Sequence, residues 1–215
     1  MNKVSEAVKR LNKILPLKAN QQNLGKEMRQ LHRDILYSYI DIGRSLSRAE
    51  IAQRVEDTEQ TITTLQKNDL VVFDERGEPT GAYPFTMEKR EHKLNVNGHV
   101  VHSMCALDSL AVSAMYDVEL EIQSVCRVSQ LPVVIKQKGL DVLNKNDIQD
   151  VYFAISWNAA SVSCCCADSL CTEMIFIKGE VAANDWLNED ADNRQIFMLD
   201  EAIEFAAGFF VPLLQ

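Results

Sequence analysis

Apolar residues recur at helical spacing through the first third of the chain. Residues 3–15 and 22–41 each place their apolar side chains on one stripe, which predicts two amphipathic helices. Ser47 and Glu50 have the spacing of a capping box, so a short helix is expected to begin there. After a tight turn, a second short helix is expected at about residues 59–68. This part of the chain is therefore predicted to be helical.

Two β-like stretches, residues 70–73 and 82–86, follow these helices and are joined by a polar loop. Helix, tight turn, helix and β-hairpin together resemble a winged helix-turn-helix, which raises the alternative of a metal-responsive DNA-binding regulator. The expected recognition helix, residues 59–67, holds one lysine and no arginine. The loop is mostly acidic, with Asp74, Glu75 and Glu78 against Arg76. Such surfaces repel phosphate, so we expect a scaffold that packs on the rest of the chain.

Beyond a boundary near residues 80–88, short strand patterns alternate with helical ones. The boundary predicts a helical winged-helix-like part at residues 1–85 and a second part at residues 86–215. Strands are expected at 93–96, 99–101, 118–125, 131–136, 151–157, 173–177 and 195–199, with helices after Cys105, at 182–188 and from Asp200. The predicted fold class is α+β, in which the helical part precedes a mostly antiparallel mixed sheet covered by helices.

Local signals in this later part predict where individual elements turn or end. Asn97-Gly98 between two strand patterns is typical of a hairpin with a type I′ turn. Asp200 has the properties of an N-cap for the last helix, which is expected to run through Ala207 and to end near Gly208.

Composition narrows the function classes. The 215 residues carry a formal net charge of −9, which argues against a general nucleic-acid binder or a protein that binds anionic membranes. No run reaches the ~18 apolar residues that a membrane-spanning helix needs. The first residues are amphipathic and lack the uninterrupted apolar core of a signal peptide, so a cytoplasmic location is expected.

The chain has six cysteines, which a cytoplasmic location would keep reduced. Cys105 and Cys126 stand alone, whereas Cys164, Cys165, Cys166 and Cys171 crowd into one short segment. Consecutive cysteines cannot all point the same way, and paired Cys-x-x-Cys spacing does not occur, which argues against structural zinc and against a redox dithiol. A thiol-dependent oxidoreductase therefore stays a minor alternative.

Cys105 is the cysteine with the most informative sequence context. A β-branched run ends at Ser103 and a helical apolar pattern begins at Met104, so Cys105 is expected in or near the first turn of a helix. The helix dipole there predicts a lowered thiol pKa. Asp108 follows three residues later, which places its carboxyl group over the same face as the sulfur. The competing interpretation is a buried cysteine beside a solvated acid.

A soft metal fits these thiols better than zinc. Mercury(II) prefers thiolates, and two of them in near-linear geometry suffice. Cysteines from separate parts of the chain could therefore form a mercury site without the spacing that zinc requires.

The chain resembles the organomercurial (alkylmercury) lyase family through several motifs. These are Met-Cys-Ala-Leu-Asp at 104–108, the lone Cys126 after a strand, Leu-Cys-Thr-Glu-Met-Ile-Phe-Ile at 170–177, Asn184-Asp185-Trp186 and Asp200-Glu201-Ala202. The resemblance covers most of the later half, and the first half agrees in arrangement. It implies an enzyme that cleaves the carbon–mercury bond and releases a hydrocarbon and Hg(II) without a cofactor.

The resemblance also implies residue roles. Cys105 and Cys171 match the two catalytic cysteines and Asp108 matches the catalytic aspartate, so these three are the expected catalytic and mercury-binding residues. Cys126 matches a cysteine usually taken as structural. Two departures stand out: some relatives have an aromatic residue in place of Met104, and residues 164–166 add three cysteines. The second ligand therefore stays open among the four clustered thiols, with Cys171 favoured.

The implied partners follow from mercury chemistry. The substrate is a small organomercurial, and small external thiols are needed because Hg–S bonds exchange rather than dissociate. A mercuric reductase is a candidate acceptor of Hg(II), and Cys164, Cys165 and Cys166 are candidates for receiving the metal on its way out. No nucleic acid or membrane partner is expected.

Overall fold

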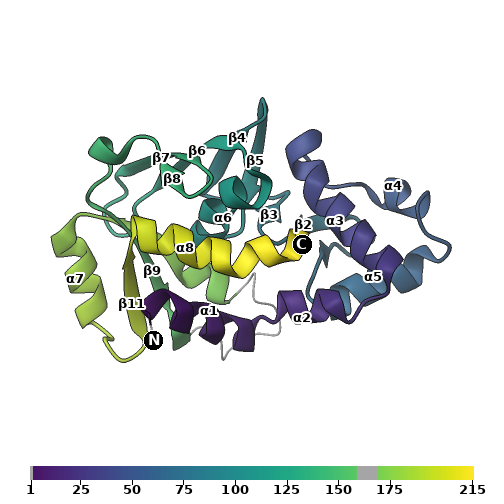
Figure 1. The fold of residues 1–215 in the computed structure, drawn as a ribbon, viewed down its shortest axis with the longest axis horizontal. Coiled ribbons are helices and arrows are strands. Elements are labelled where there is room, and N and C mark those ends of the chain that lie inside the picture. The colour runs from purple at the N-terminus through teal and green to yellow at the C-terminus, as the bar shows by residue number, and fades with distance from the viewer. Residues whose placement is uncertain (1, 159–168) are drawn as a thin grey trace.

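The fold is built around one buried helix, α6 (Ala106–Tyr116). Its sequence is apolar or small on almost every face, and a helix of this kind is stable only when it is covered on all sides. It is contacted by strands β5 (His99–Ser103), β6 (Glu119–Val125), β7 (Pro132–Lys138) and β10 (Met174–Lys178) and by helix α8 (Leu199–Phe210). The structure, a computed structural model, describes residues 2–158 and 169–215 (Figure 1).

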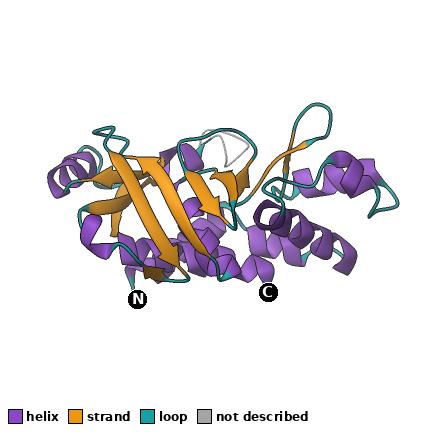
Figure 2. Cartoon of the chain, turned by 90° about the horizontal axis from the view of Figure 1, so that it is seen from above, coloured by secondary structure: helices purple, strands orange, loops and turns teal. Residues whose placement is uncertain are grey.

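The strands form two antiparallel sheets (Figure 2), and strands of both sheets contact this helix. The larger has eight strands in the order β1-β2-β3-β5-β4-β6-β7-β8, and the smaller has the order β10-β9-β11. The strands are β1 (Val72–Phe73), β2 (Pro79–Ala82), β3 (Phe85–Thr86), β4 (Lys93–Val96), β5 (His99–Ser103), β6 (Glu119–Val125), β7 (Pro132–Lys138), β8 (Asp141–Val142), β9 (Val151–Ser156), β10 (Met174–Lys178) and β11 (Arg194–Met198). The pairings within the described residues are all antiparallel, and the predicted α+β class is confirmed.

The β4–β5 hairpin confirms the predicted turn. Asn97 and Gly98 both have positive φ, 50° and 78°, which a type I′ turn requires. The hairpin matters for function because β5 runs directly into the loop before α6.

The expected helices of the first part are present: α1 (Lys3–Ile14), α3 (Lys26–Asp41), α4 (Arg48–Ala52) and α5 (Thr58–Lys67). The capping box is formed, since the Ser47 Oγ accepts from the Glu50 N–H and the Glu50 carboxylate accepts from the Ser47 N–H at 2.7 Å. A further helix, α2 (Leu17–Gln22), was not predicted. The expected helix at 22–41 begins later, because Gly25 takes an extended conformation as its N-cap.

The expected limits of the last helix are wrong at both ends. The helix begins at Leu199, because the Glu201 carboxylate accepts a hydrogen bond from the backbone N–H of Met198 at 3.0 Å and so caps it there. Gly208 lies inside the helix. A Cβ added at Gly208 would lie 3.2 Å from the Val8 side chain, so this glycine allows α1 to pack closely on α8 (Figure 1).

The two predicted parts are joined by one sheet. β3 pairs with β5, with Phe85 opposite Ser103, so the hairpin strands β1–β3 continue into the larger sheet. The division between residues 1–85 and 86–215 stays a prediction. Among the helices of the described residues, none is both long and apolar enough to cross a membrane.

Candidate active site

Cys105 lies at the junction between β5 and α6. Its backbone is extended, with φ −149° and ψ 178°, and it is the N-cap of α6. The Cys105 Sγ accepts a hydrogen bond from the Asp108 N–H at 3.4 Å, so sulfur takes the place that a Ser or Asp oxygen usually has at this position. The sequence produces this arrangement because only Met104 and Cys105 separate a strand-forming run from an apolar helix.

Cys171 reaches the same place from a distant part of the chain. It lies in a short 3₁₀ helix, Leu170–Glu173, directly before β10, and β10 contacts α6. One sulfur each from Cys105 and Cys171 and one carboxylate oxygen of Asp108 lie within 4.8 Å of one another, and all three residues are buried. The structure therefore brings together the three residues expected to act on mercury.

The predicted lowering of the Cys105 thiol pKa is wrong. Burial, with a smaller contribution from the neighbouring Asp108 carboxylate, raises the pKa of this thiol to about 12, although hydrogen bonds with Cys171 and the Asp108 N–H oppose this. The helix N-terminus does contact the sulfur, as expected, and this contact lowers the thiol pKa. The loss of water around a residue that is 1 % exposed raises the pKa by more. Cys105 therefore rests as a protonated thiol.

Asp108 is not a solvated acid. Its side chain is buried, and burial raises its pKa to about 7, against the opposing effects of the Cys105 hydrogen bonds and the Arg90 charge. One carboxylate oxygen, Oδ2, has no hydrogen-bond partner among the described residues. A carboxyl group that titrates near neutral pH beside two thiols is suited to accepting and returning a proton.

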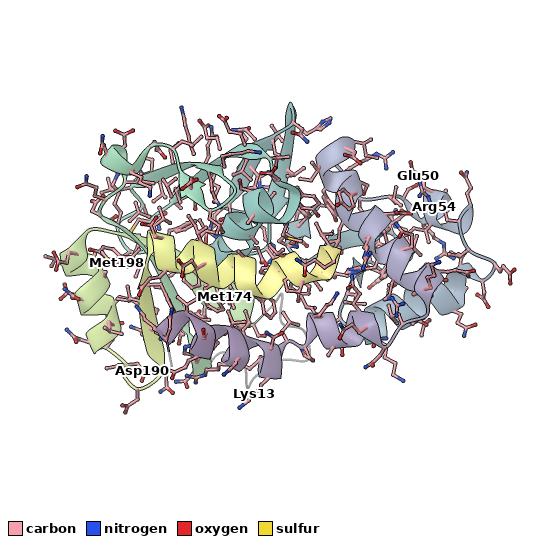
Figure 3. All side chains as sticks on the ribbon, viewed as in Figure 1. Lys13, Glu50, Arg54, Met174, Asp190 and Met198 are labelled. Carbon is pink, nitrogen blue, oxygen red and sulfur yellow. The ribbon has the colours of Figure 1, made fainter. Side chains whose placement is uncertain are left out.

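Met174 is a site residue to which sequence analysis assigned no role. Its Sδ lies 3.5 Å from the Cys105 Sγ, and its side chain is buried near the middle of the molecule (Figure 3). The only signal for it in the sequence is its place three residues after Cys171. The site thus contains a thioether in addition to two thiols and a carboxyl group.

A surface hollow of about 280 Å³ reaches Cys171. It is lined by Arg90, Glu91, His92, Met104, Arg127, Cys171 and Thr172. An ion pair of 2.5 Å between Arg127 and Glu91 fixes part of its wall, and the His92 Nδ1 lies 2.8 Å from the Ser124 Oγ. A larger hollow of about 870 Å³ lies on the N-terminal helices and includes none of the three site residues. Of these two hollows in the described part of the chain, the smaller one contacts a site sulfur, that of Cys171.

Cys126 lies outside this cluster, at the end of β6. Its Sγ accepts hydrogen bonds from the backbone N–H groups of Ser129 at 3.3 Å and of Lys178 at 3.2 Å. It therefore connects the β6–β7 turn to the end of β10. The remaining cysteines, Cys164, Cys165 and Cys166, lie outside the described residues.

Two buried thiols, a thioether and a titratable carboxyl group at the start of a buried helix define a site for a soft, thiol-seeking metal. The donor set lacks imidazole among the residues within 4.8 Å, which distinguishes it from the usual zinc sites of enzymes. The class of protein that fits is one that binds or transforms a soft metal compound inside an α+β fold.

The comparisons with known proteins identify the family. The family model described as "MerB: Alkylmercury lyase" matches residues 85–211, more than half of the chain, and the chain belongs to the alkylmercury lyase family. An alkylmercury lyase of Staphylococcus epidermidis is 27% identical over 157 residues, covering 73% of this chain and 68% of the relative. One of Bacillus cereus is 24% identical over 209 residues, covering 94% and 88%.

A solved structure supports the fold. A crystal structure of the mercury-bound form of MerB2 matches with a TM-score of 0.74 at 18% identity and covers 98% of this chain and 100% of that chain. Family membership confirms the prediction of an organomercurial lyase and favours it over the alternative of a DNA-binding regulator.

Proposed function

We propose that Cys105, Asp108 and Cys171 carry out the protonolytic cleavage of the carbon–mercury bond in alkyl- or arylmercury compounds. The observation that carries this assignment is that the two sulfurs and a carboxylate oxygen lie within 4.8 Å of one another in a buried site. A single mercury atom can contact both thiolates at this spacing, with the carboxyl group close enough to reach the carbon attached to the metal.

The two thiols activate the carbon. A carbon bound to mercury is a poor base while the metal has only one good donor. When the Cys105 and Cys171 thiolates both bind, they increase the electron density on mercury and make the carbon more basic. The Hg–C bond then breaks as a C–H bond forms, and Hg(II) stays bound to the two sulfurs.

Asp108 moves the proton. The Cys105 thiol has a raised pKa, so it does not release its proton to water before the metal binds. Mercury binding makes that proton acidic, because metal ligands must be deprotonated. The Asp108 carboxylate, with one oxygen unpartnered among the described residues, accepts the proton and delivers it to the carbon as general acid.

Substrate entry and product release use the hollow that reaches Cys171. With an organomercurial thiolate as substrate, the two protein thiols supply two protons. One proton forms the hydrocarbon and the other leaves with the displaced thiol. No cofactor takes part in these steps. Hg(II) then leaves by thiol exchange at Cys171, the sulfur that lines the hollow. The acceptor is a small thiol or a mercuric reductase, in a cytoplasmic setting.

The experiment that tests this function measures hydrocarbon release. The purified chain, given phenylmercury acetate and excess small thiol, is expected to release benzene, which gas chromatography quantifies. The Cys105→Ser variant is expected to release none above the rate without enzyme, because a hydroxyl group does not bind mercury well. Benzene release by Cys105→Ser at the wild-type rate would contradict the assignment.

A further inference from the structure

Met174 adds a third sulfur to the site. Its Sδ lies 3.5 Å from the Cys105 Sγ, and both side chains are buried, at 2 % and 1 % exposure. We propose that the Met174 thioether is a third, soft ligand of mercury, in addition to the Cys105 and Cys171 thiolates. This proposal rests on the proposed function of those two cysteines as mercury ligands.

The backbone holds Met174 in this position. It is the first residue of β10, where it lies opposite Ile155 on the central strand β9 of the smaller sheet. Cys171 lies in the 3₁₀ helix that leads directly into β10, so one short segment supplies two of the three sulfurs. A methionine side chain is flexible by itself, but a buried one at a paired strand position has few alternative placements.

The position of the thioether suits a secondary ligand. Two thiolates bind Hg(II) in near-linear geometry, on opposite sides of the metal. From a position 3.5 Å from the Cys105 sulfur, the Met174 sulfur can contact the metal from the side of the S–Hg–S line, where it would not compete with either thiolate. Thioethers are soft donors, so mercury accepts such a contact more readily than one from an oxygen.

This third ligand would leave mercury binding to the sulfurs and proton transfer to Asp108. An Asp108 oxygen that binds mercury is not free to carry a proton to the carbon. With Met174 beside the metal, soft coordination comes from three sulfurs and Asp108 remains available for proton transfer. The alternative is that Met174 only fills the core and accepts a weak hydrogen bond from the Cys105 thiol.

Selenium labelling distinguishes these alternatives. The chain has seven methionines, and selenomethionine in their place gives each a heavy scatterer that X-ray absorption at the mercury edge detects. Protein loaded with one equivalent of mercuric chloride is expected to show selenium in the first shell of mercury. Because selenium replaces sulfur only in methionine, the label also distinguishes a thioether ligand from the additional cysteines at residues 164–166. Absence of selenium from that shell in the wild-type protein would overturn the proposal.

Two leucine variants provide the matched comparison. Met174→Leu keeps an apolar side chain of similar volume without sulfur, and Met115→Leu makes the same change in a buried residue at the other end of α6. The selenium contact is expected to vanish in Met174→Leu and to remain in Met115→Leu. A contact that persists in Met174→Leu would assign it to another methionine and contradict the proposal.

Mercury retention gives a second readout. Met174→Leu is expected to lose Hg(II) to glutathione at about tenfold lower thiol concentration than Met115→Leu, a size typical of losing a supporting partner at a metal site. Equal retention would overturn the proposal. Benzene release by the wild-type protein is measured in parallel, so a chain that cleaves phenylmercury but shows no selenium contact refutes this inference alone.

Discussion

The regions around Cys105 and Cys126 use a buried cysteine in opposite ways. Both sulfurs are almost inaccessible, at 1 % and 0 % exposure, and both accept backbone N–H groups. Around Cys105 a second thiol, a carboxyl group and a thioether converge. Around Cys126 the sulfur accepts hydrogen bonds from the backbone N–H groups of Ser129 and Lys178, and it belongs to no such cluster among the described residues.

The thiol pKa values diverge accordingly. Burial and the Asp108 charge raise the pKa of Cys105, whereas at Cys126 hydrogen bonds from Ser129 and Lys178 outweigh burial and lower it. The cysteine with the lower thiol pKa is therefore the one that we propose to be structural. Reactivity toward mercury depends on having a second thiol and a proton acceptor within reach, more than on the resting population of thiolate.

The largest expected effect separates the two regions directly. Cys171→Ser is expected to reduce single-turnover benzene release by about 10³-fold or more, because groups that act as a unit are each needed. Cys126→Ser, a matched change at a buried cysteine outside the cluster, is expected to retain release within a few-fold. Equal losses in the two variants would remove the distinction between the regions.

A smaller effect concerns the carboxyl group that only the Cys105 region contains. Since burial raises the Asp108 pKa to about 7, the carboxylate that accepts the thiol proton is lost as pH falls below that value. Single-turnover cleavage is expected to fall about tenfold per pH unit below the pKa and to level off above it. Asp108→Asn is expected to lower the rate by about 10²-fold and to abolish the pH dependence. A wild-type rate that is flat from pH 5 to 8 would contradict this role.

The smallest expected effect is on stability at Cys126. Cys126→Ala leaves two backbone N–H groups without their sulfur acceptor, which is expected to lower the free energy of unfolding by about 1–3 kcal/mol. Cys126→Ser keeps an acceptor and is expected to cost less. Urea denaturation followed by circular dichroism measures both, and a larger loss for Ser than for Ala would contradict the structural interpretation.

Features that depend on local sequence are the ones that the sequence predicts well. The Asn97-Gly98 turn, the Ser47–Glu50 capping box and the helix after Cys105 each follow from a few neighbouring residues, and each is present. The last helix shows the limit of this approach. The local sequence predicts that the helix ends near Gly208. The role of this glycine is instead to leave room for α1, which is almost 200 residues away in sequence.

The candidate site shows the same limit. Met-Cys-Ala-Leu-Asp and Leu-Cys-Thr-Glu-Met pointed to Cys105, Asp108 and Cys171 through family resemblance, and the structure brings these residues together. Their protonation could not be predicted, because the local helix-end argument omits burial by β10 and α8, which reverses the expected direction of the Cys105 pKa. The role proposed for Met174 rests on its distance to Cys105, which the local sequence does not contain.

The packing of α1 on α8 constrains the order in which the chain folds. The ion pair between Lys3 and Glu201 joins residues 198 positions apart, so the main packing partner of α1 is missing until nearly all of these residues exist. At synthesis rates of about 5–20 residues per second, α1 waits about 10–40 s for its partner helix. During that time its apolar stripe of Val4, Ala7 and Leu11 stays uncovered. Helix α1 thus precedes the other described helices in synthesis and is among the last of them to dock, and its contacts with α8 stabilise the finished protein without guiding the early steps of folding.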